Sequence, residues 1–338
     1  MRSHTRILPV VLSCLALCAL ILDSKTALSG ASEGLELCFR TVIPSLFPFF
    51  VVSIFLSSLL TCASFLKPVS KALKLPAGGE VYFLLGMLGG YPVGARCVAQ
   101  ACTQGKLSRQ DGERMLGFCS NAGPAFLFGM GASVLPSMEM CFLVWGIHIL
   151  SSILGGAAVP AAPAEGQCHR EIKPISLSDA LQQAIMAMAQ VCGWVVVMRV
   201  VMRFMEQWFL WMLPSDLRMI FAGLLELSNG VCGLKEIPSL AIRFTLFSVF
   251  LSFGGICVLL QTKSVLQGSS LTGTQYFPGK VMQASWSLIL SAAALPMVDP
   301  GGWRPAPLLL GVTGCGILMR LLQIRSKNSS RNLRTCRV

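Results

Sequence analysis

Residues that could do chemistry lie inside otherwise apolar stretches of this sequence, and Arg96 is the first of them. It directly follows the segment Gly89-Gly-Tyr-Pro-Val-Gly94. A guanidinium there can bind a carboxylate through two parallel hydrogen bonds. The alternative is an arginine whose side chain only extends to the cytoplasmic interface of a membrane. Arg96 and Tyr91 are therefore candidate ligands of an anionic substrate.

Glu226 is a second candidate substrate ligand, together with Ser228 and Asn229, because all three lie in an apolar run beside Gly230. An ionisable group inside a membrane is costly and is by default a functional candidate. Glu226 can carry a coupling proton or cation, or neutralise Arg96 when no substrate is bound. The alternative is a structural ion pair between two parts of the fold.

The segment Ser120-Asn-Ala-Gly-Pro124 is expected to interrupt a helix. A freed helix N-terminus presents unpaired N–H groups and the positive end of a dipole, which suit an anion. Ser120, Asn121 and Gly123 are therefore candidate ligands. The alternative is an ordinary kink that packs against a neighbouring helix.

Arg199 and Arg203 are four residues apart and fall on one face of a long apolar helix. They are candidates for an anion pathway, although Arg203 can equally approach the outer interface. His148 is interpreted as a packing histidine. The 14 cysteines include no CxxC pair, and we find no phosphate-binding loop, metal-ligand spacing or nucleophile motif. We therefore expect no enzyme activity, no metal and no cofactor.

The composition indicates a membrane protein. Of the 338 residues, 54% are hydrophobic and 12% are charged, whereas a soluble domain carries roughly 25% charged residues. The net charge of +12 could suggest nucleic acid, but the longest basic stretch, 320–337, directly follows an apolar run. That is typical of a cytoplasmic flank under the positive-inside rule. We expect the lipid bilayer as partner and no nucleic acid.

Apolar runs define the expected spans. They cover 7–22, 41–66, 81–102, 115–135, 138–160, 189–213, 217–234, 240–262, 281–298 and 306–323. Runs 81–102 and 217–234 contain glycine, proline or ionisable residues, so we expect them to be re-entrant or broken segments. This leaves about eight full spans, with run 7–22 as an uncleaved first helix rather than a signal peptide.

The basic clusters set the expected topology. With the N-terminus in the cytoplasm, Lys71, Arg109, Arg170, Lys263 and the C-terminal tail all fall on the cytoplasmic side. The expected location is a multi-pass protein of the cell membrane.

The two halves of the chain resemble each other. The segment 86–94 has a counterpart in 223–230, and 120–124 has a weaker one in 252–255. In the expected topology the two units start in opposite directions, which predicts an inverted repeat of the kind found in transporters. The expected organisation is an N-terminal helix (1–30), a first unit (31–160), a cytoplasmic linker (161–179), a second unit (180–279) and a C-terminal hairpin with a basic tail (280–338).

These motifs resemble a known family. Gly89-Gly-Tyr-Pro-Val-Gly-Ala-Arg96, Phe118-Cys-Ser-Asn-Ala-Gly-Pro-Ala-Phe126, Leu224-Leu-Glu-Leu-Ser-Asn-Gly230 and Ser252-Phe-Gly-Gly255 resemble, in this order, segments of the sporulation integral membrane proteins called YlbJ or SpoVV. That family belongs to the group with a nucleoside-recognition, or Gate, domain, whose repeats resemble those of concentrative nucleoside transporters. The resemblance adds Gln261 to the candidate substrate ligands and Lys280, with Tyr276, to the pathway.

The resemblance implies export of dipicolinate from the mother cell towards the forespore, across the outer forespore membrane. A small anionic solute also fits the basic residues inside the apolar runs. The alternatives are a nucleoside or other small-solute transporter of the same fold, and a non-transporting membrane scaffold. Coupling of transport to a proton or cation, and assembly into a homo-oligomer, are further possibilities that the sequence leaves open.

Overall fold

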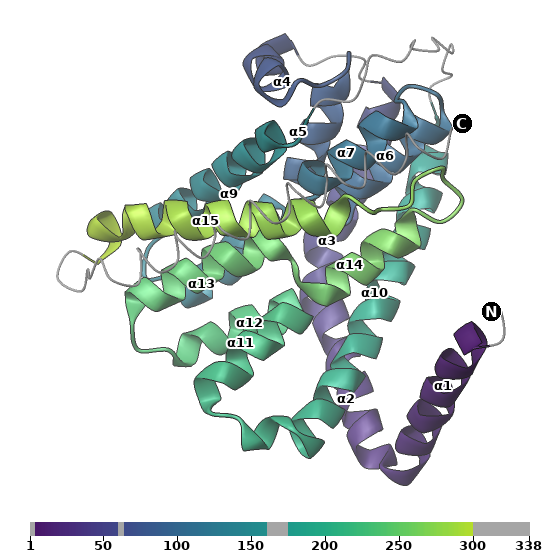
Figure 1. Cartoon of the computed structure of the whole chain (residues 1–338), viewed down its shortest axis with the longest axis vertical. Coiled ribbons are helices and arrows are strands. Elements are labelled where there is room, and N and C mark those ends of the chain that lie inside the picture. The colour runs from purple at the N-terminus through teal and green to yellow at the C-terminus, as the bar shows by residue number, and fades with distance from the viewer. Residues whose placement is uncertain (1–3, 60–63, 161–174, 300–338) are drawn as a thin grey trace.

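The structure is a computed structural model that describes residues 4–59, 64–160 and 175–299 (Figure 1). Within these ranges every regular element is a helix and there is no strand. A helix satisfies its own backbone hydrogen bonds, so this architecture allows an apolar chain to lie in lipid. The expected all-α fold is confirmed for this part of the chain.

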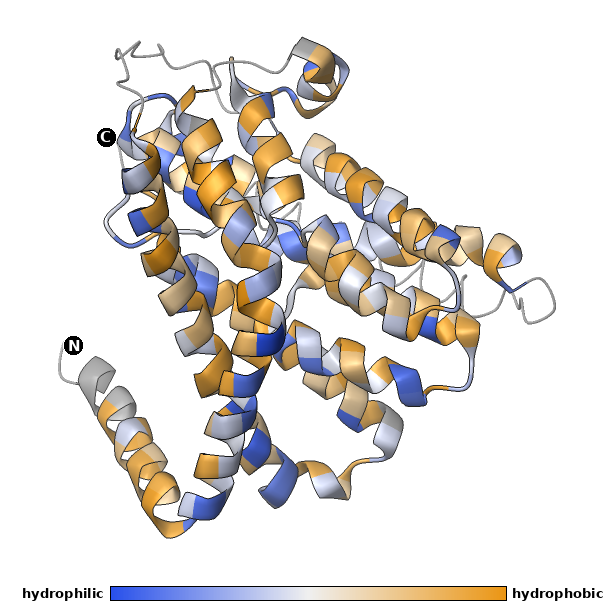
Figure 2. Cartoon of the chain, turned by 180° about the vertical axis from the view of Figure 1, so that it is seen from behind, coloured by the Kyte–Doolittle hydropathy of each residue, from blue (hydrophilic) through white to orange (hydrophobic). Residues whose placement is uncertain are grey.

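Five helical stretches among the described residues are long and apolar enough to cross a membrane. They cover Ser24–Leu56, Met138–Ala158, Leu177–Trp208, Leu240–Val265 and Tyr276–Val298. Figure 2 shows apolar residues along the length of these helices. A shorter helix, α1 (His4–Leu22), contains the apolar run 7–22. The total of about eight full spans stays a prediction, and the expected span at 306–323 lies outside the described residues.

The first and third of these stretches begin earlier than the sequence prediction placed them. The first consists of α2 (Ser24–Leu37), a π-helical turn (Cys38–Val42) and α3 (Ile43–Leu59). The third stretch is the single helix α10 (Leu177–Trp208). The expected starts at 41 and 189 were wrong because the amphipathic segments before them continue the same helices.

Helices α2 and α10 pack closely side by side (Figure 1). A Cβ atom added to Gly30 or Gly34 would lie 2.8 Å from the Cα atoms of Val200 and Val196, respectively. Side chains at these two positions would therefore push the helices apart.

Both segments expected to be broken are broken. Helices α5 (Gly79–Gly89) and α6 (Val93–Thr103) are separated at residues 90–92, and α11 (Ser215–Leu225) and α12 (Leu227–Gly233) are separated at Glu226. In each case the two short helices pack against each other as a hairpin.

Two further helices are also interrupted. Helices α7 (Arg109–Cys119) and α8 (Pro124–Val134) are separated by residues 120–123. Helices α13 (Leu240–Phe253) and α14 (Gly255–Val265) meet at Gly254, whose φ of 80° favours glycine. The break expected in 120–124 is therefore present.

The order of elements is the same in the two halves. A long helix, a hairpin of two short helices, a broken helix and a second long helix follow one another as α2–α3, α5–α6, α7–α8 and α9 (Met138–Ala158). The same order returns as α10, α11–α12, α13–α14 and α15 (Tyr276–Val298). The short helix α4 (Lys67–Leu73) is additional. This order agrees with a repeat; its inverted geometry and the unit boundaries stay predictions.

Glycines bring the arms of both hairpins into close contact. A Cβ atom on Gly86 of α5 would lie 3.1 Å from the Cα atom of Gly94 of α6, and Cβ atoms on these two glycines would lie 1.6 Å and 1.8 Å from the carbonyl oxygen of Cys119 in α7. In the second hairpin, a Cβ atom on Gly230 would lie 2.1 Å from the Cα atom of Gly223. Each hairpin therefore depends on glycine where its two helices meet.

Candidate functional site

The four helix breaks lie next to one another. A Cβ atom on Gly90 would lie 3.1 Å from the backbone nitrogen of Gly123, so the first hairpin touches the α7–α8 break. A Cβ atom on Gly255 would lie 3.2 Å from the carbonyl oxygen of Leu225, so the second hairpin touches the α13–α14 break. The hydroxyl of Tyr91 donates to the carbonyl oxygen of Leu251, over 3.0 Å, and thereby links the two halves. The sequence therefore folds its irregular backbone into one region.

His148 of α9 connects two of these breaks. The backbone N–H of Ala122 donates to Nε2 of His148 over 3.2 Å, and Nδ1 lies 3.2 Å from the hydroxyl of Ser252. Because Nε2 accepts, the proton of the neutral ring belongs on Nδ1, which donates to Ser252. The geometry is that of a satisfied packing histidine.

Lys280 of α15 lies beside the α7–α8 break and is only 1% exposed. Its ammonium donates to the carbonyl oxygen of Ser120, to Asn121 Oδ1 at 3.3 Å and to Gln283 Oε1 at 2.7 Å. Among the described residues no carboxylate pairs with it. A buried charge without an opposite charge is costly, so this lysine marks a place where an anion would be stabilised.

Two aromatic rings accompany this ammonium. Its nitrogen lies 5.1 Å from the ring centre of Tyr91 and 5.9 Å from that of Tyr276. Aromatic faces attract cations, which offsets part of the cost of burial.

Asn121 is occupied by contacts within the protein. Its Nδ2 donates to the carbonyl oxygen of Phe118 over 2.8 Å, and its Oδ1 accepts from Gln283 as well as Lys280. It therefore holds the α7–α8 break in place in this structure. Gly123 serves the same break through its contact with Gly90.

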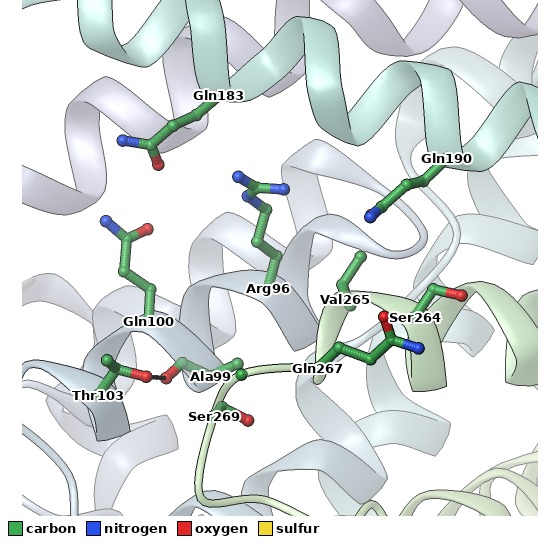
Figure 3. A pocket seen from close by; sticks show the side chains of 11 residues that line it. Arg96, Ala99, Gln100, Thr103, Gln183, Gln190, Ser264, Val265, Gln267 and Ser269 are labelled. Carbon is green, nitrogen blue, oxygen red and sulfur yellow. Dashed lines mark hydrogen bonds between the residues drawn. The ribbon is translucent and has the colours of Figure 1, made fainter.

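Arg96 lines a pocket of about 460 Å³ between α6, α10 and the end of α14. Figure 3 shows its side chain pointing towards α10, between Gln183 and Gln190. The residues lining the pocket are Arg96, Ala99, Gln100, Thr103, Gln183, Gln190, Ser264, Val265, Gln267, Gly268 and Ser269. Within the described ranges no carboxylate forms an ion pair with Arg96. The pocket thus combines one available cation with several amides.

Glu226 caps the N-terminus of α12. Its carboxylate accepts from the backbone N–H groups of Ser228, over 3.0 Å, and Asn229, over 2.8 Å. The nearby cation that acts on it is Arg199 rather than Arg96. Ser228 and Glu226 thus form the hairpin turn, and the suggested neutralisation of Arg96 by Glu226 is not the arrangement found here.

Arg199 and Arg203 are both paired with acids. Their Nε atoms each donate to Glu33 of α2 over 2.8 Å, and Nη1 of Arg203 lies 3.1 Å from Glu206. Nη1 of Arg199 also donates to Asn229 Oδ1 over 3.2 Å. In this structure neighbouring carboxylates therefore neutralise both arginines, and their place in an anion path stays a prediction.

Arg96, Asn121 and Asn229 do not line one pocket in this structure. Neither asparagine lines the Arg96 pocket, since Asn121 contacts Lys280 and Asn229 contacts Arg199. Gln261, expected as a ligand, donates to the sulfur of Cys257 inside α14 and does not line the pocket either.

Two features of the site were not predicted from the residue pattern of the sequence. Gln183 and Gln190 are seven residues apart and so fall on one helix face; that spacing could have marked them. Tyr276, Lys280, Gln283 and Ser287 follow a 4–3–4 spacing in an otherwise apolar helix, which places them on one polar stripe. That stripe predicts a buried polar contact independently of any family.

One comparison with known proteins found a relative. The sporulation integral membrane protein YlbJ of Bacillus subtilis (strain 168) is 22% identical over 315 residues, covering 78% of this chain and 76% of that protein. This similarity confirms the expected resemblance to the YlbJ-type sporulation integral membrane proteins. The several long apolar helices of the described residues agree with a multi-pass integral membrane protein. No family model matches it, and no solved structure matches it.

Proposed function

We propose that this chain is a transporter of a small anionic solute, dipicolinate, exported from the mother cell towards the forespore during endospore formation. The supporting observation is the Arg96 pocket, which offers an unpaired guanidinium among glutamine amides. The similarity to YlbJ, a sporulation integral membrane protein, supports the cellular setting.

The chemistry of the pocket suits a small dicarboxylate. Its volume of about 460 Å³ lies in the range of roughly 300–1,000 Å³ usual for small-molecule sites. Arg96 can bind one carboxylate through two hydrogen bonds. The amide groups of Gln100, Gln183 and Gln190 can donate further hydrogen bonds or accept them from water.

The position of the pocket supports loading from the cytoplasm. It is lined by the C-terminal part of α6, the N-terminal part of α10 and the end of α14. Lys106 and Lys263, which flank two of these segments, are expected in the cytoplasm under the positive-inside rule. The contacting helix breaks would then close the path beyond the pocket until the two units move relative to each other.

A nucleoside or another small solute is the alternative substrate, because amides also bind nucleobases. A neutral nucleoside gains nothing from the charge of Arg96. A non-transporting scaffold is the other alternative, and it has no need for irregular backbone gathered in one region. Coupling of transport to a proton or cation, and assembly into a homo-oligomer, are both compatible with this proposal.

Uptake of labelled dipicolinate and a labelled nucleoside into proteoliposomes tests this function. We expect Arg96→Gln to lower dipicolinate uptake by roughly tenfold or more, because a charge-assisted hydrogen bond contributes about 1.5–3 kcal/mol. Arg96→Lys should restore only part of the rate, since lysine cannot make the planar paired contact.

Arg218→Gln is a matched control, because this exposed arginine of α11 does not line the pocket and donates to the Leu213 carbonyl oxygen. Unchanged dipicolinate uptake by Arg96→Gln would contradict the proposed role. Faster uptake of the nucleoside than of dipicolinate by the unmodified protein would favour the alternative substrate.

A further inference from the structure

Three buried hydroxyl groups near Lys280 make no hydrogen bond of normal geometry. They belong to Ser120 at the α7–α8 break, Thr262 of α14 and Tyr276 at the start of α15. These residues are between 0% and 2% exposed, so bulk water does not reach them. The hydroxyl of Tyr276 faces the side chains of Thr262 and Ser120. An unsatisfied buried hydroxyl costs stability, so three together point to a ligand rather than to packing.

The charge beside these hydroxyls is also uncompensated. An ammonium has three donors, and those of Lys280 are used by Ser120 O, Asn121 and Gln283. Its positive charge nevertheless has no carboxylate partner in the described part of the chain. His148 cannot compensate this charge, because an imidazole is either neutral or cationic. The region therefore places three hydroxyls, which face one another around Tyr276 without a hydrogen bond of normal geometry, within the field of a buried cation.

We propose that the hydroxyls of Ser120, Thr262 and Tyr276, together with the charge of Lys280, form an inner subsite for a carboxylate group of the transported solute. This inference rests on the proposed function and adds a second binding position to it. A carboxylate has acceptor positions for several hydrogen bonds, and hydroxyls can rotate to supply them. Lys280 contributes its charge, while the hydroxyls contribute the hydrogen bonds.

Helix α14 connects the inner subsite with the Arg96 pocket. Thr262 precedes Ser264 and Val265 within one turn of α14, and both of those residues line the pocket. Ser120 belongs to the region where the helix breaks meet. A solute held at Arg96 would therefore reach the inner subsite before it passes the breaks, so the two cations would act in succession.

Hydroxyl-deletion variants test this inference by equilibrium binding of dipicolinate to the purified full-length protein. We expect Tyr276→Phe and Thr262→Val each to raise the Kd by roughly tenfold, since each removes a hydrogen bond to a charged group. The melting temperature of the unliganded variants should stay the same or rise, because an unsatisfied buried hydroxyl is removed. A purely structural role would instead lower stability and binding together.

Tyr82→Phe is the matched control, because Tyr82 of α5 is also buried, at 5% exposure, and lies in another part of the fold. It should leave the Kd unchanged. If the unmodified protein binds dipicolinate through Arg96 and both hydroxyl variants bind equally well, the inner subsite is wrong while the proposed function stands.

Two further outcomes overturn the assignment in different ways. If the unmodified protein binds no dipicolinate, the proposed function falls and the inner subsite for its carboxylate falls with it. If chloride stabilises the protein, dipicolinate does not, and Tyr276→Phe abolishes the chloride effect, the site binds an inorganic anion and is not part of the solute path.

Discussion

His148 shows at the residue scale how one side chain holds the irregular backbone together. It accepts from Ala122 in the first half of the chain and contacts Ser252 in the second. A polar group left unsatisfied in the interior costs about 1–3 kcal/mol. The packing role inferred for His148 therefore means that loss of its ring should destabilise the folded protein.

We expect His148→Leu to destabilise the protein by about 1–3 kcal/mol, because it leaves the Ala122 N–H without its acceptor. His148→Gln should recover part of this loss, since its side-chain oxygen can accept the same hydrogen bond. Thermal unfolding in detergent measures both variants. Equal stability of His148→Leu and the unmodified protein would show that water or another group replaces the ring.

At the scale of elements, the close contacts of the two helical hairpins require glycine. A Cβ atom on Gly86 would overlap the Cys119 carbonyl oxygen, and one on Gly223 would lie 2.5 Å from the ring of Phe250. Backbone cannot move aside as a flexible side chain can. The two hairpins should therefore tolerate even one methyl group poorly.

We expect Gly86→Ala to abolish folding or to destabilise strongly, by more than the roughly 1–3 kcal/mol usual for overpacking. Gly146→Ala is the matched control, because a Cβ atom there meets nothing within 4 Å; alanine there should stabilise helix α9 by about 0.5–1 kcal/mol. The yield and melting temperature of both variants provide the measurement. A stable Gly86→Ala protein would mean that the hairpin sits farther from the α7–α8 break than described.

Element type could be predicted from the sequence here, whereas side-chain partners could not. Glycine, proline and an ionisable residue within an apolar run locate the breaks at 90–92 and at Glu226, because these residues interrupt helices locally. The Glu33–Arg199 pair joins residues 166 positions apart, so nothing local could reveal it. The early start of α10 was missed because polar residues such as Gln183, which precede the apolar run, face a pocket rather than water.

At the scale of the whole molecule, the pocket brings the end of α6, the start of α10 and the end of α14 together. The chain segments next to them carry the basic residues expected in the cytoplasm. The ion pairs of Glu33, Arg203 and Glu206 involve the opposite end of α10. This arrangement agrees with a membrane protein whose pocket end and ion-pair end face opposite sides of the membrane.

We expect reporter fusions or cysteine labelling at Lys71, Arg109, Arg170 and the C-terminus all to indicate the cytoplasm, because basic flanks remain there. In an experimental structure, segments 35–135 and 180–265 should superpose after about a half-turn around an axis in the membrane plane. An external signal at Arg109 would show that α5–α6 crosses the membrane fully, and the inverted repeat would then be wrong.

Comparing dipicolinate with its neutral diamide, pyridine-2,6-dicarboxamide, tests the central claim, that Arg96 makes the pocket selective for negative charge. The two compounds share shape and ring, so a difference in Kd reports charge recognition. We expect the unmodified protein to bind dipicolinate at least about tenfold more tightly, and Arg96→Gln to lose most of that preference. Equal affinities in the unmodified protein, or a full preference retained by Arg96→Gln, would contradict the account.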